Sequence, residues 1–230
     1  MATDRAISSG IVKRHGAKLP HWTRESAAYA VTFRLEDSLP ASVLRGWLAE
    51  REDIVKRAAA LGRPLSVYEL ARLDELHSER IERYLDAGHG ACWMNKPEIA
   101  ELTQNAVLHF DLERYRIFAW CVMPNHVHVI LQPLPAHELP GVLHSWKSFT
   151  SLQANRLLGR SGMFWQSEYY DHLIRDRTDL ARQIAYVLRN PASAGLVDWP
   201  WVGRRSEALL ESVFAPMIEA PATASTDTAA

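Results

Sequence analysis

The chain has 230 residues, of which 47% are hydrophobic and 23% are charged, and its formal net charge is −1. This composition is ordinary for a globular protein, and the length allows one decorated domain or two small ones. It excludes a membrane span, because no apolar run approaches roughly 20 residues, and no apolar segment follows the basic N-terminus as in a secretory signal. The two cysteines, Cys92 and Cys121, give no disulfide framework, so we expect a cytoplasmic protein.

Helices dominate the first half of the chain. Residues 1–25 lack strong periodicity and predict a mobile arm, whereas the alternating strand formers of 29–35 predict the first strand. Apolar residues then recur at helical spacing. Three helices are expected there: one from Ser38-Leu39-Pro40 to the break at Gly62, one over about 67–85, and one from Lys96-Pro97 to Asp111. We interpret the helical part of 41–90 as an insertion after the first strand.

Strand-like segments return in the second half. Residues 115–122 and 126–132 both alternate, and Met123-Pro124-Asn125 between them indicates a hairpin. The elements expected to follow are a helix over about 140–158, an aromatic loop at 162–166, a short strand over 169–174 and a helix with its N-cap at Thr178. Because a residue before proline disfavours the helical conformation, this last helix should end near Asn190.

This order of elements predicts an α+β fold with a ferredoxin-like antiparallel sheet flanked by helices. We place the domain at 22–203. An N-terminal arm at 1–21 would precede it, and a tail at 204–230, ending in Ala, Thr, Ser and Pro, would follow it as a disordered segment.

Charge is unevenly distributed along the chain. Residues 36–113 hold 9 basic and 15 acidic side chains, a net charge of −6, and residues 204–230 carry −2. The remaining segments hold 15 basic and 8 acidic side chains, a net charge of +7. A basic working face is what a phosphate backbone requires, so this distribution permits a nucleic-acid partner.

Two histidines lie two residues apart in the second strand of the predicted hairpin. Residues i and i+2 of a strand point to one face, so His126 and His128 project side by side while Val127 and Val129 point into a core. Neutral imidazole is the commonest metal ligand, and two of them make half of a divalent cation site. By itself the pair is equally compatible with a site that binds no metal.

The last predicted helix carries a tyrosine and an asparagine four residues apart. Tyr186 and Asn190 therefore share a helix face. A tyrosine hydroxyl, with a free pKa of about 10, is a weak nucleophile that a neighbouring metal would make competent. An amide oxygen suits a hard cation such as Mg²⁺ or Mn²⁺. Each residue taken alone also fits a structural role, as a half-buried helix tyrosine and as a residue before proline.

Four segments occur in a characteristic order: His126-Val127-His128, residues 162–166, residues 169–175, and Tyr186-Val187-Leu188-Arg189-Asn190-Pro191. In these segments the chain resembles the single-tyrosine HUH transposases, in particular the IS200-like, REP-associated tyrosine transposases, over about 22–202. The resemblance implies a metal-dependent endonuclease and strand-transferase acting on single-stranded, hairpin-forming DNA. It implies that His126, His128 and Asn190 hold the metal. It also implies that Tyr186 attacks a phosphodiester, which leaves a 5′-phosphotyrosine and a free 3′-hydroxyl.

Basic and aromatic side chains near these segments are candidates for DNA contacts. We expect phosphate contacts from about half of the basic residues Lys147, Arg156, Arg160, Arg175, Arg177, Arg182 and Arg189. Base stacking competes with core packing for Trp146, Phe164, Trp165, Tyr169 and Tyr170. Tyr169 and Tyr170 rank below Tyr186 as nucleophiles, because neither has an asparagine one helical turn away.

Two other functions fit the same residues. A catalytically quiet, domesticated DNA-binding protein would keep the fold without the chemistry. A Zn²⁺ hydrolase would use His126 and His128, but no spaced motif nearby offers its third ligand. The expected partner is single-stranded or hairpin DNA rather than a membrane, and the chain is expected to act as a monomer or a homodimer.

Overall fold

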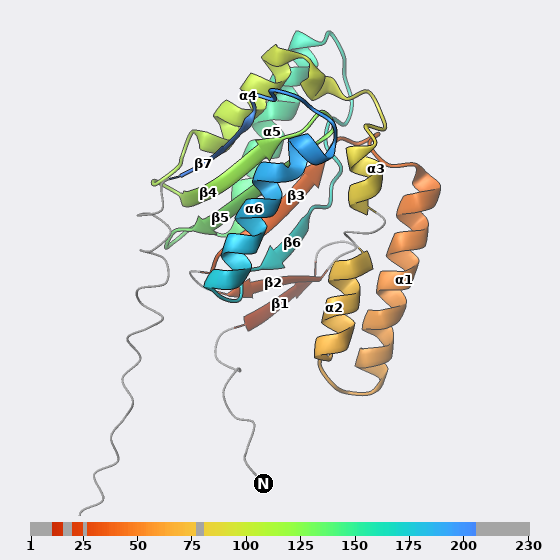
Figure 1. Ribbon diagram of the computed structural model, residues 1–230. Coiled ribbons are helices and arrows are strands. Elements are labelled where there is room, and N and C mark those ends of the chain that lie inside the picture. The colour runs from red at the N-terminus through yellow and green to blue at the C-terminus, as the bar shows by residue number, and fades with distance from the viewer. Residues whose placement is uncertain (1–10, 16–19, 25–26, 77–80, 206–230) are drawn as a thin grey trace, which may run out of the picture.

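The computed structural model describes residues 11–15, 20–24, 27–76 and 81–205 (Figure 1). Its centre is a five-stranded antiparallel sheet in the order β6-β3-β5-β4-β7. The strands are β3 (Tyr29–Arg34), β4 (Tyr115–Val122), β5 (His126–Pro133), β6 (Tyr170–Leu173) and β7 (Val202–Arg204). Without the edge strand β7, the order and the alternating helices are those of a ferredoxin-like sheet, so the predicted α+β fold is confirmed.

The β4–β5 hairpin supplies the middle of the sheet. Its turn closes on a hydrogen bond from the Met123 N–H to the His126 carbonyl oxygen (2.8 Å). β5 lies between β3 and β4, and its residues are almost all buried. In the register with β3, Thr32 is opposite His128 and Arg34 is opposite His126. Directly opposite residues of an antiparallel pair point to the same face of the sheet. Thr32 and Arg34 of β3 therefore lie on the same face as the two histidines of β5.

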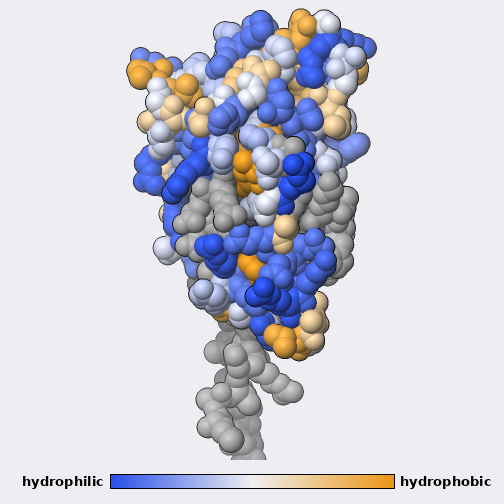
Figure 2. All heavy atoms as spheres, turned by 90° about the vertical axis from the view of Figure 1, so that its right-hand side faces the viewer, coloured by the Kyte–Doolittle hydropathy of each residue, from blue (hydrophilic) through white to orange (hydrophobic). Residues whose placement is uncertain are grey.

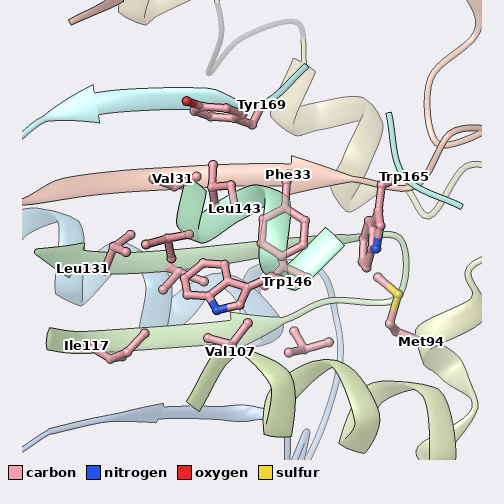
Figure 3. Packing of buried hydrophobic residues seen from close by; sticks show 14 of the residues in the cluster. Val31, Phe33, Met94, Val107, Ile117, Leu131, Leu143, Trp146, Trp165 and Tyr169 are labelled. Atoms are coloured by element: carbon pink, nitrogen blue, oxygen red, sulfur yellow. The ribbon is translucent and has the colours of Figure 1, made fainter. Parts of the chain in front are cut away.

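Each face of the sheet has its own helical layer (Figure 1). Helices α4 (Pro97–Leu108) and α5 (Leu139–Leu157) cover one face, after the short 3₁₀ helix η2 (Trp93–Asn95). Val127 and Val129 point into this layer, where Figure 3 shows Trp146 and Trp165 packed around Phe33. Helix α6 (Arg177–Ser193) covers the opposite face. The period-2 alternation of β5 therefore sends its valines to one layer and its histidines to the other.

The segment after β3 is helical, as the sequence predicts. It forms α1 (Ala41–Ala60), α2 (Val67–Leu76) and α3 (Arg83–Asp86), and α1 packs against α2 beside the sheet (Figure 1). Figure 2 views the molecule from this side, where hydrophilic residues cover much of the described surface. Within the predicted helix over 67–85, residues 77–80 lie outside the described part. A separate small core of Leu39, Trp47, Ile81 and Leu85 anchors α3.

The end of the chain differs from the prediction at three points. Asp176, not Thr178, caps α6, because its side chain accepts a hydrogen bond from the Asp179 N–H at 2.8 Å. The helix does not end near Asn190 but runs through Pro191 to Ser193. A proline in the last turn removes only one N–H donor, and the carbonyl oxygen of Pro191 still accepts a hydrogen bond from the Leu196 N–H at 2.9 Å.

The predicted tail also begins with ordered residues. Arg204 ends β7, and Arg205 Nε donates to Asp111 Oδ2 at 2.8 Å. The sequence missed β7 because three residues carry no readable alternation. Residues 206–230 lie outside the described part.

The N-terminal segment also departs from the arm that the sequence predicts. β1 (Ile11–His15) and β2 (Pro20–Arg24) pair antiparallel as a separate two-stranded sheet. The other residues before 27 lie outside the described part. Within the described residues, no helix has the length and apolar character needed to cross a bilayer.

Candidate active site

His126 and His128 converge on the α6 face of the sheet. Both are almost completely buried, at 1% and 3% exposure, and their Nε2 atoms are 2.9 Å apart. The Nδ1 atom of each imidazole also has a hydrogen-bond partner. His126 Nδ1 is 2.7 Å from Asn125 Oδ1, and His128 Nδ1 is 2.8 Å from Thr32 Oγ1. Metal-binding histidines are typically oriented in this way, through a partner on the ring nitrogen that does not bind the metal.

These contacts form one directed chain of hydrogen bonds. Asn125 Nδ2 donates to the His89 carbonyl oxygen at 2.9 Å, so Asn125 Oδ1 is the atom that faces His126 and can only accept. His126 therefore carries its hydrogen on Nδ1, and its Nε2 accepts from His128 Nε2–H. His128 Nδ1 in turn accepts from the Thr32 hydroxyl. Burial lowers the pKa of His128 to about 3, which keeps this ring in the neutral form that binds metals.

Helix α6 brings Tyr186 and Asn190 to the same place. The rings of Tyr186 and His128 are 5.5 Å apart between centroids and nearly perpendicular, at 86°. Asn190 Nδ2 donates to the Tyr186 hydroxyl oxygen at 3.0 Å. Asn190 Oδ1 is buried and has no hydrogen-bond partner. Such an atom is costly to bury unless something else binds it, so Asn190 holds an oxygen available to a cation.

Two carboxylates complete the surroundings, and the sequence analysis did not find them. Glu82 lies close enough to Tyr186 for its negative charge to raise the pKa of the phenol. Asp86, one helical turn later, places Oδ1 3.9 Å from His126 Nε2, and this buried oxygen has no hydrogen-bond partner. Their spacing of four puts them on one helix face. The insertion is acidic, and acidic residues four apart are also typical of a helix face that points to solvent. The sequence therefore could not single out Glu82 and Asp86.

Burial and these carboxylates set the protonation of the site. Burial, followed by the negative charges of Glu82 and Asp86, raises the pKa of Tyr186 above its ordinary value. Burial also raises the pKa of Glu82 to about 7 and that of Asp86 to about 6. Burial therefore shifts the equilibrium of all three groups toward their neutral forms.

The side chains gathered here fit a divalent cation, although they do not yet surround a single metal position. Among the described residues, no three His, Cys, Asp or Glu side chains are already arranged around one metal position. His126 and His128 offer two nitrogens, and Asn190 adds the orphaned amide oxygen. Imidazole nitrogen and amide oxygen are both donors that divalent cations accept in proteins.

Seven basic residues are predicted to contact DNA. Three make bonds within the chain: Lys147 Nζ to the Ser167 carbonyl oxygen (2.7 Å), Arg160 to the Met163 carbonyl oxygen (3.0 Å), and Arg182 to Asp179 (2.6 Å). Burial also lowers the pKa of Lys147 to about 8. The exposed residues among the seven are Arg156, Arg175, Arg177, Arg182 and Arg189.

Most of the aromatic candidates for base stacking belong to the core. Trp146, Phe164, Trp165 and Tyr169 are buried in the cluster beneath α4 and α5, on the face opposite the histidines. The indole of Trp165 donates to Thr150 Oγ1 at 2.8 Å, which leaves it no polar edge for a ligand. Tyr170 lies opposite Thr32 in β6, so it points to the histidine face and remains a second tyrosine there.

The chain is thus an α+β protein in which two histidines of a ferredoxin-like sheet face a helix tyrosine and form a candidate metal centre. The family model described as transposase IS200-like matches residues 95–189, which contain His126, His128 and Tyr186. Over this segment the chain is similar to the IS200-like transposases. Asn190, Glu82 and Asp86 lie outside the matched segment.

Two curated proteins are similar to part of the chain. A candidate REP-associated tyrosine transposase of Haemophilus influenzae is 31% identical over 108 residues, which cover 40% of this chain and 59% of that protein. A REP-associated tyrosine transposase of Escherichia coli K12 is 27% identical over 106 residues, covering 44% of this chain and 62% of that protein. The chain thus spans about three fifths of the length of the curated relatives that it matches.

Two solved structures match about four fifths of the chain. One is described as a REP-associated tyrosine transposase bound to a REP hairpin. It is 16% identical, with coverage of 81% of this chain and 82% of that chain and a TM-score of 0.46. The other is a candidate transposase of Deinococcus radiodurans, 13% identical, with coverage of 80% and 93% and a TM-score of 0.28.

Proposed function

We propose that this protein is a metal-dependent endonuclease and strand-transferase for single-stranded, hairpin-forming DNA, with Tyr186 as its nucleophile. One observation carries the proposal: the phenol of Tyr186 lies against His128, on the face where both histidine Nε2 atoms converge. The similarity of residues 95–189 to the IS200-like transposases supports DNA as the substrate. The Tyr186 phenol meets the histidines of its own chain, which supports action of Tyr186 within its own site.

The proposed metal is Mg²⁺ or Mn²⁺. His126 Nε2, His128 Nε2 and Asn190 Oδ1 would hold it, because two of these atoms converge and the third is buried without a partner. When bound, a divalent cation would neutralise charge that develops on the scissile phosphate.

The chain's own residues define the order of bond changes. Asn190 orients the Tyr186 hydroxyl through its 3.0 Å hydrogen bond. The phenolic oxygen attacks the phosphorus, a new O–P bond forms, and the bond to the 3′ oxygen breaks. The resulting 5′-phosphotyrosine keeps the energy of the broken bond, so a second 3′-hydroxyl reverses the attack without an external energy source. The exposed Arg175, Arg177 and Arg189 on or beside α6 are the proposed phosphate contacts.

The test is incubation with Mn²⁺ and labelled oligonucleotide hairpins, followed by a denaturing gel and peptide mapping of the adduct. We expect a covalent product on the peptide that contains Tyr186. Tyr186→Phe should abolish it, whereas the matched variant Tyr170→Phe should leave it unchanged. Hairpin binding by the wild-type protein without any adduct would instead support the catalytically quiet, domesticated DNA-binding protein.

A further inference from the structure

A buried arginine lies on the histidine face of the sheet, and the function proposed above gives it no role. Arg34 is the last residue of β3 and is directly opposite His126 of β5. Directly opposite residues of an antiparallel pair point to one face, with roughly 5 Å between their Cβ atoms. Arg34 therefore lies beside a proposed metal ligand, at the end of β3 that α3 approaches (Figure 1).

Arg34 is buried without the partners that a buried charge requires. The residue is only 6% exposed. Its Nε is buried, and no described residue accepts a hydrogen bond from that atom. A charged group with an unpaired buried donor costs free energy, whereas an exposed arginine is solvated by water. A ligand that accepts a hydrogen bond from Arg34 would remove this cost.

The charges around Arg34 leave this edge of the sheet positive. Burial lowers the pKa of Arg34 to about 10, and the negative charge of Glu168 opposes that shift only in part. Glu168 lies just before β6 and acts in the same way on Lys147 of α5, while Arg34 and Lys147 repel each other. Among the described residues, one carboxylate thus acts on both cations, which leaves the pair short of one negative charge.

We propose that Arg34 binds a phosphate of the DNA strand that crosses the histidine face, within one nucleotide of the bond that Tyr186 attacks. This inference rests on the proposed function, because it names a contact to the same substrate at the same site. Arginine suits the role, since its planar guanidinium forms two charge-assisted hydrogen bonds with a phosphate and stays protonated when it is buried. A bound phosphate would also supply the missing negative charge.

The experiment measures hairpin affinity while the charge of one phosphate at a time is removed. The hairpin is one whose cleavage site has been mapped from the covalent adduct, and a neutral methylphosphonate replaces in turn the scissile phosphate and each of its two neighbours. Binding is measured in EDTA, so that neither cleavage nor a divalent cation contributes. For the wild type, the replacement at the contacted phosphate should weaken binding by about 10–100-fold, the usual effect of losing a hydrogen bond to a charged group.

Arg34→Gln should lose this contact alone. The variant should bind the unmodified hairpin about 10–100-fold more weakly than the wild type, and the methylphosphonate at the contacted position should weaken its binding no further. The slope of log affinity against log salt should fall by about 0.7, the value for one phosphate of a single strand. Arg45→Gln, at an exposed position of α1, is the matched control and should keep the affinity, the slope and the methylphosphonate effect of the wild type.

Thermal melting separates a DNA contact from a structural role. A buried cation with an unpaired donor does not stabilise the free protein, so Arg34→Met, with a long but uncharged side chain, should melt at or above the temperature of the wild type. A melting temperature well below the wild type would overturn the inference, because the fold itself would then need the guanidinium.

The affinity measurements can overturn the inference independently. It fails if a folded Arg34→Gln shows the wild-type loss of affinity at all three methylphosphonate positions. A wild-type protein that binds the hairpin but forms no adduct would instead overturn the proposed function, on which the position of the contacted phosphate depends.

Discussion

Thr32 and His128 face each other across the β3–β5 pair, and their side chains meet with 2.8 Å between Thr32 Oγ1 and His128 Nδ1. The register of the sheet therefore orients the imidazole. A hydroxyl can either donate or accept, so the same threonine can hold both neutral tautomers of this ring. Thr32 is thus a positioning residue for the proposed metal centre.

Replacement of Thr32 by valine should weaken metal binding while it preserves the sheet. Valine has the shape of threonine without the hydroxyl, so His128 loses the group that fixes its ring. We expect the Mn²⁺ affinity to fall by about 10–100-fold in calorimetric titration, the usual effect of losing such a partner. Thr32→Ser keeps the hydroxyl and should bind Mn²⁺ as the wild type does. Equal affinities in the valine and serine variants would contradict a positioning role.

Loss of Asn190 should also weaken metal binding. Its Oδ1 is buried without a partner, and its Nδ2 holds the Tyr186 hydroxyl. Asn190→Ala should lower the Mn²⁺ affinity by about tenfold or more, equivalent to about 1.4 kcal/mol. Electron paramagnetic resonance of bound Mn²⁺ would measure the change. A variant that binds Mn²⁺ normally would show that Asn190 serves the tyrosine alone.

The charge of Asp86 should contribute to cation affinity. Its Oδ1 lies 3.9 Å from His126 Nε2, so a cation beside that nitrogen would be attracted by the carboxylate. Asp86→Asn should lower the Mn²⁺ affinity by about tenfold, with a smaller effect at high salt. Asp53→Asn removes an acid from an exposed i,i+4 pair with Arg57 and should have no effect. If both variants bind Mn²⁺ equally, Asp86 does not act on the cation.

Stability should depend on pH in a way that reports on Glu82. Its pKa is raised from 4.5 to about 7, so between these values the folded protein holds a proton that the unfolded chain has released. This contribution to stability is complete below about pH 4.5 and is lost as pH rises through 7. Without metal, Glu82→Gln should therefore melt above the wild type at pH 8 and close to it at pH 4.5. A pH-independent difference would show that the carboxyl titrates normally in the fold.

The docking of β7 should be sensitive to a single methyl group. A Cβ on Gly203 would lie 2.4 Å from the ring of Trp120, which is itself fixed by a 2.9 Å bond from its indole N–H to Gln104. Gly203→Ala should thus destabilise the protein by about 1–3 kcal/mol in urea unfolding. Gly141→Ala, with open space around the new Cβ and a helical backbone, should be neutral or slightly stabilising. Equal stability of the two variants would mean that β7 shifts freely.

The sequence predicted the central hairpin and which of its side chains face which side of the sheet. It could do so because both strands are long and each has one apolar face. β4 occupies the predicted residues 115–122, and the histidines face away from Val127 and Val129 as expected. Local signals failed where tertiary contacts decide the structure. Pro191 does not stop α6, and β7 is too short to show a pattern.

The candidate site was predictable only in part. The spacing of His126 with His128, and of Tyr186 with Asn190, places each pair on one face of its element, and the structure brings the two pairs together. Glu82 and Asp86 reach the same site through the packing of Ile81 and Leu85 into a separate core. No periodicity within the insertion encodes that long-range contact. Likewise, the face of the sheet on which each aromatic residue lies determines whether it packs in the core or is available for base stacking, and local sequence does not specify that face.

The chain of hydrogen bonds from Thr32 through both imidazoles to Asn125 has a thermodynamic consequence. A cation can take both Nε2 atoms only if the hydrogen between them moves to His128 Nδ1, where the Thr32 oxygen can receive it. Metal uptake by the neutral rings then exchanges one tautomer for another and releases no proton from them. The binding enthalpy at a pH where the carboxyl groups are already ionised should accordingly be the same in buffers with very different heats of ionisation.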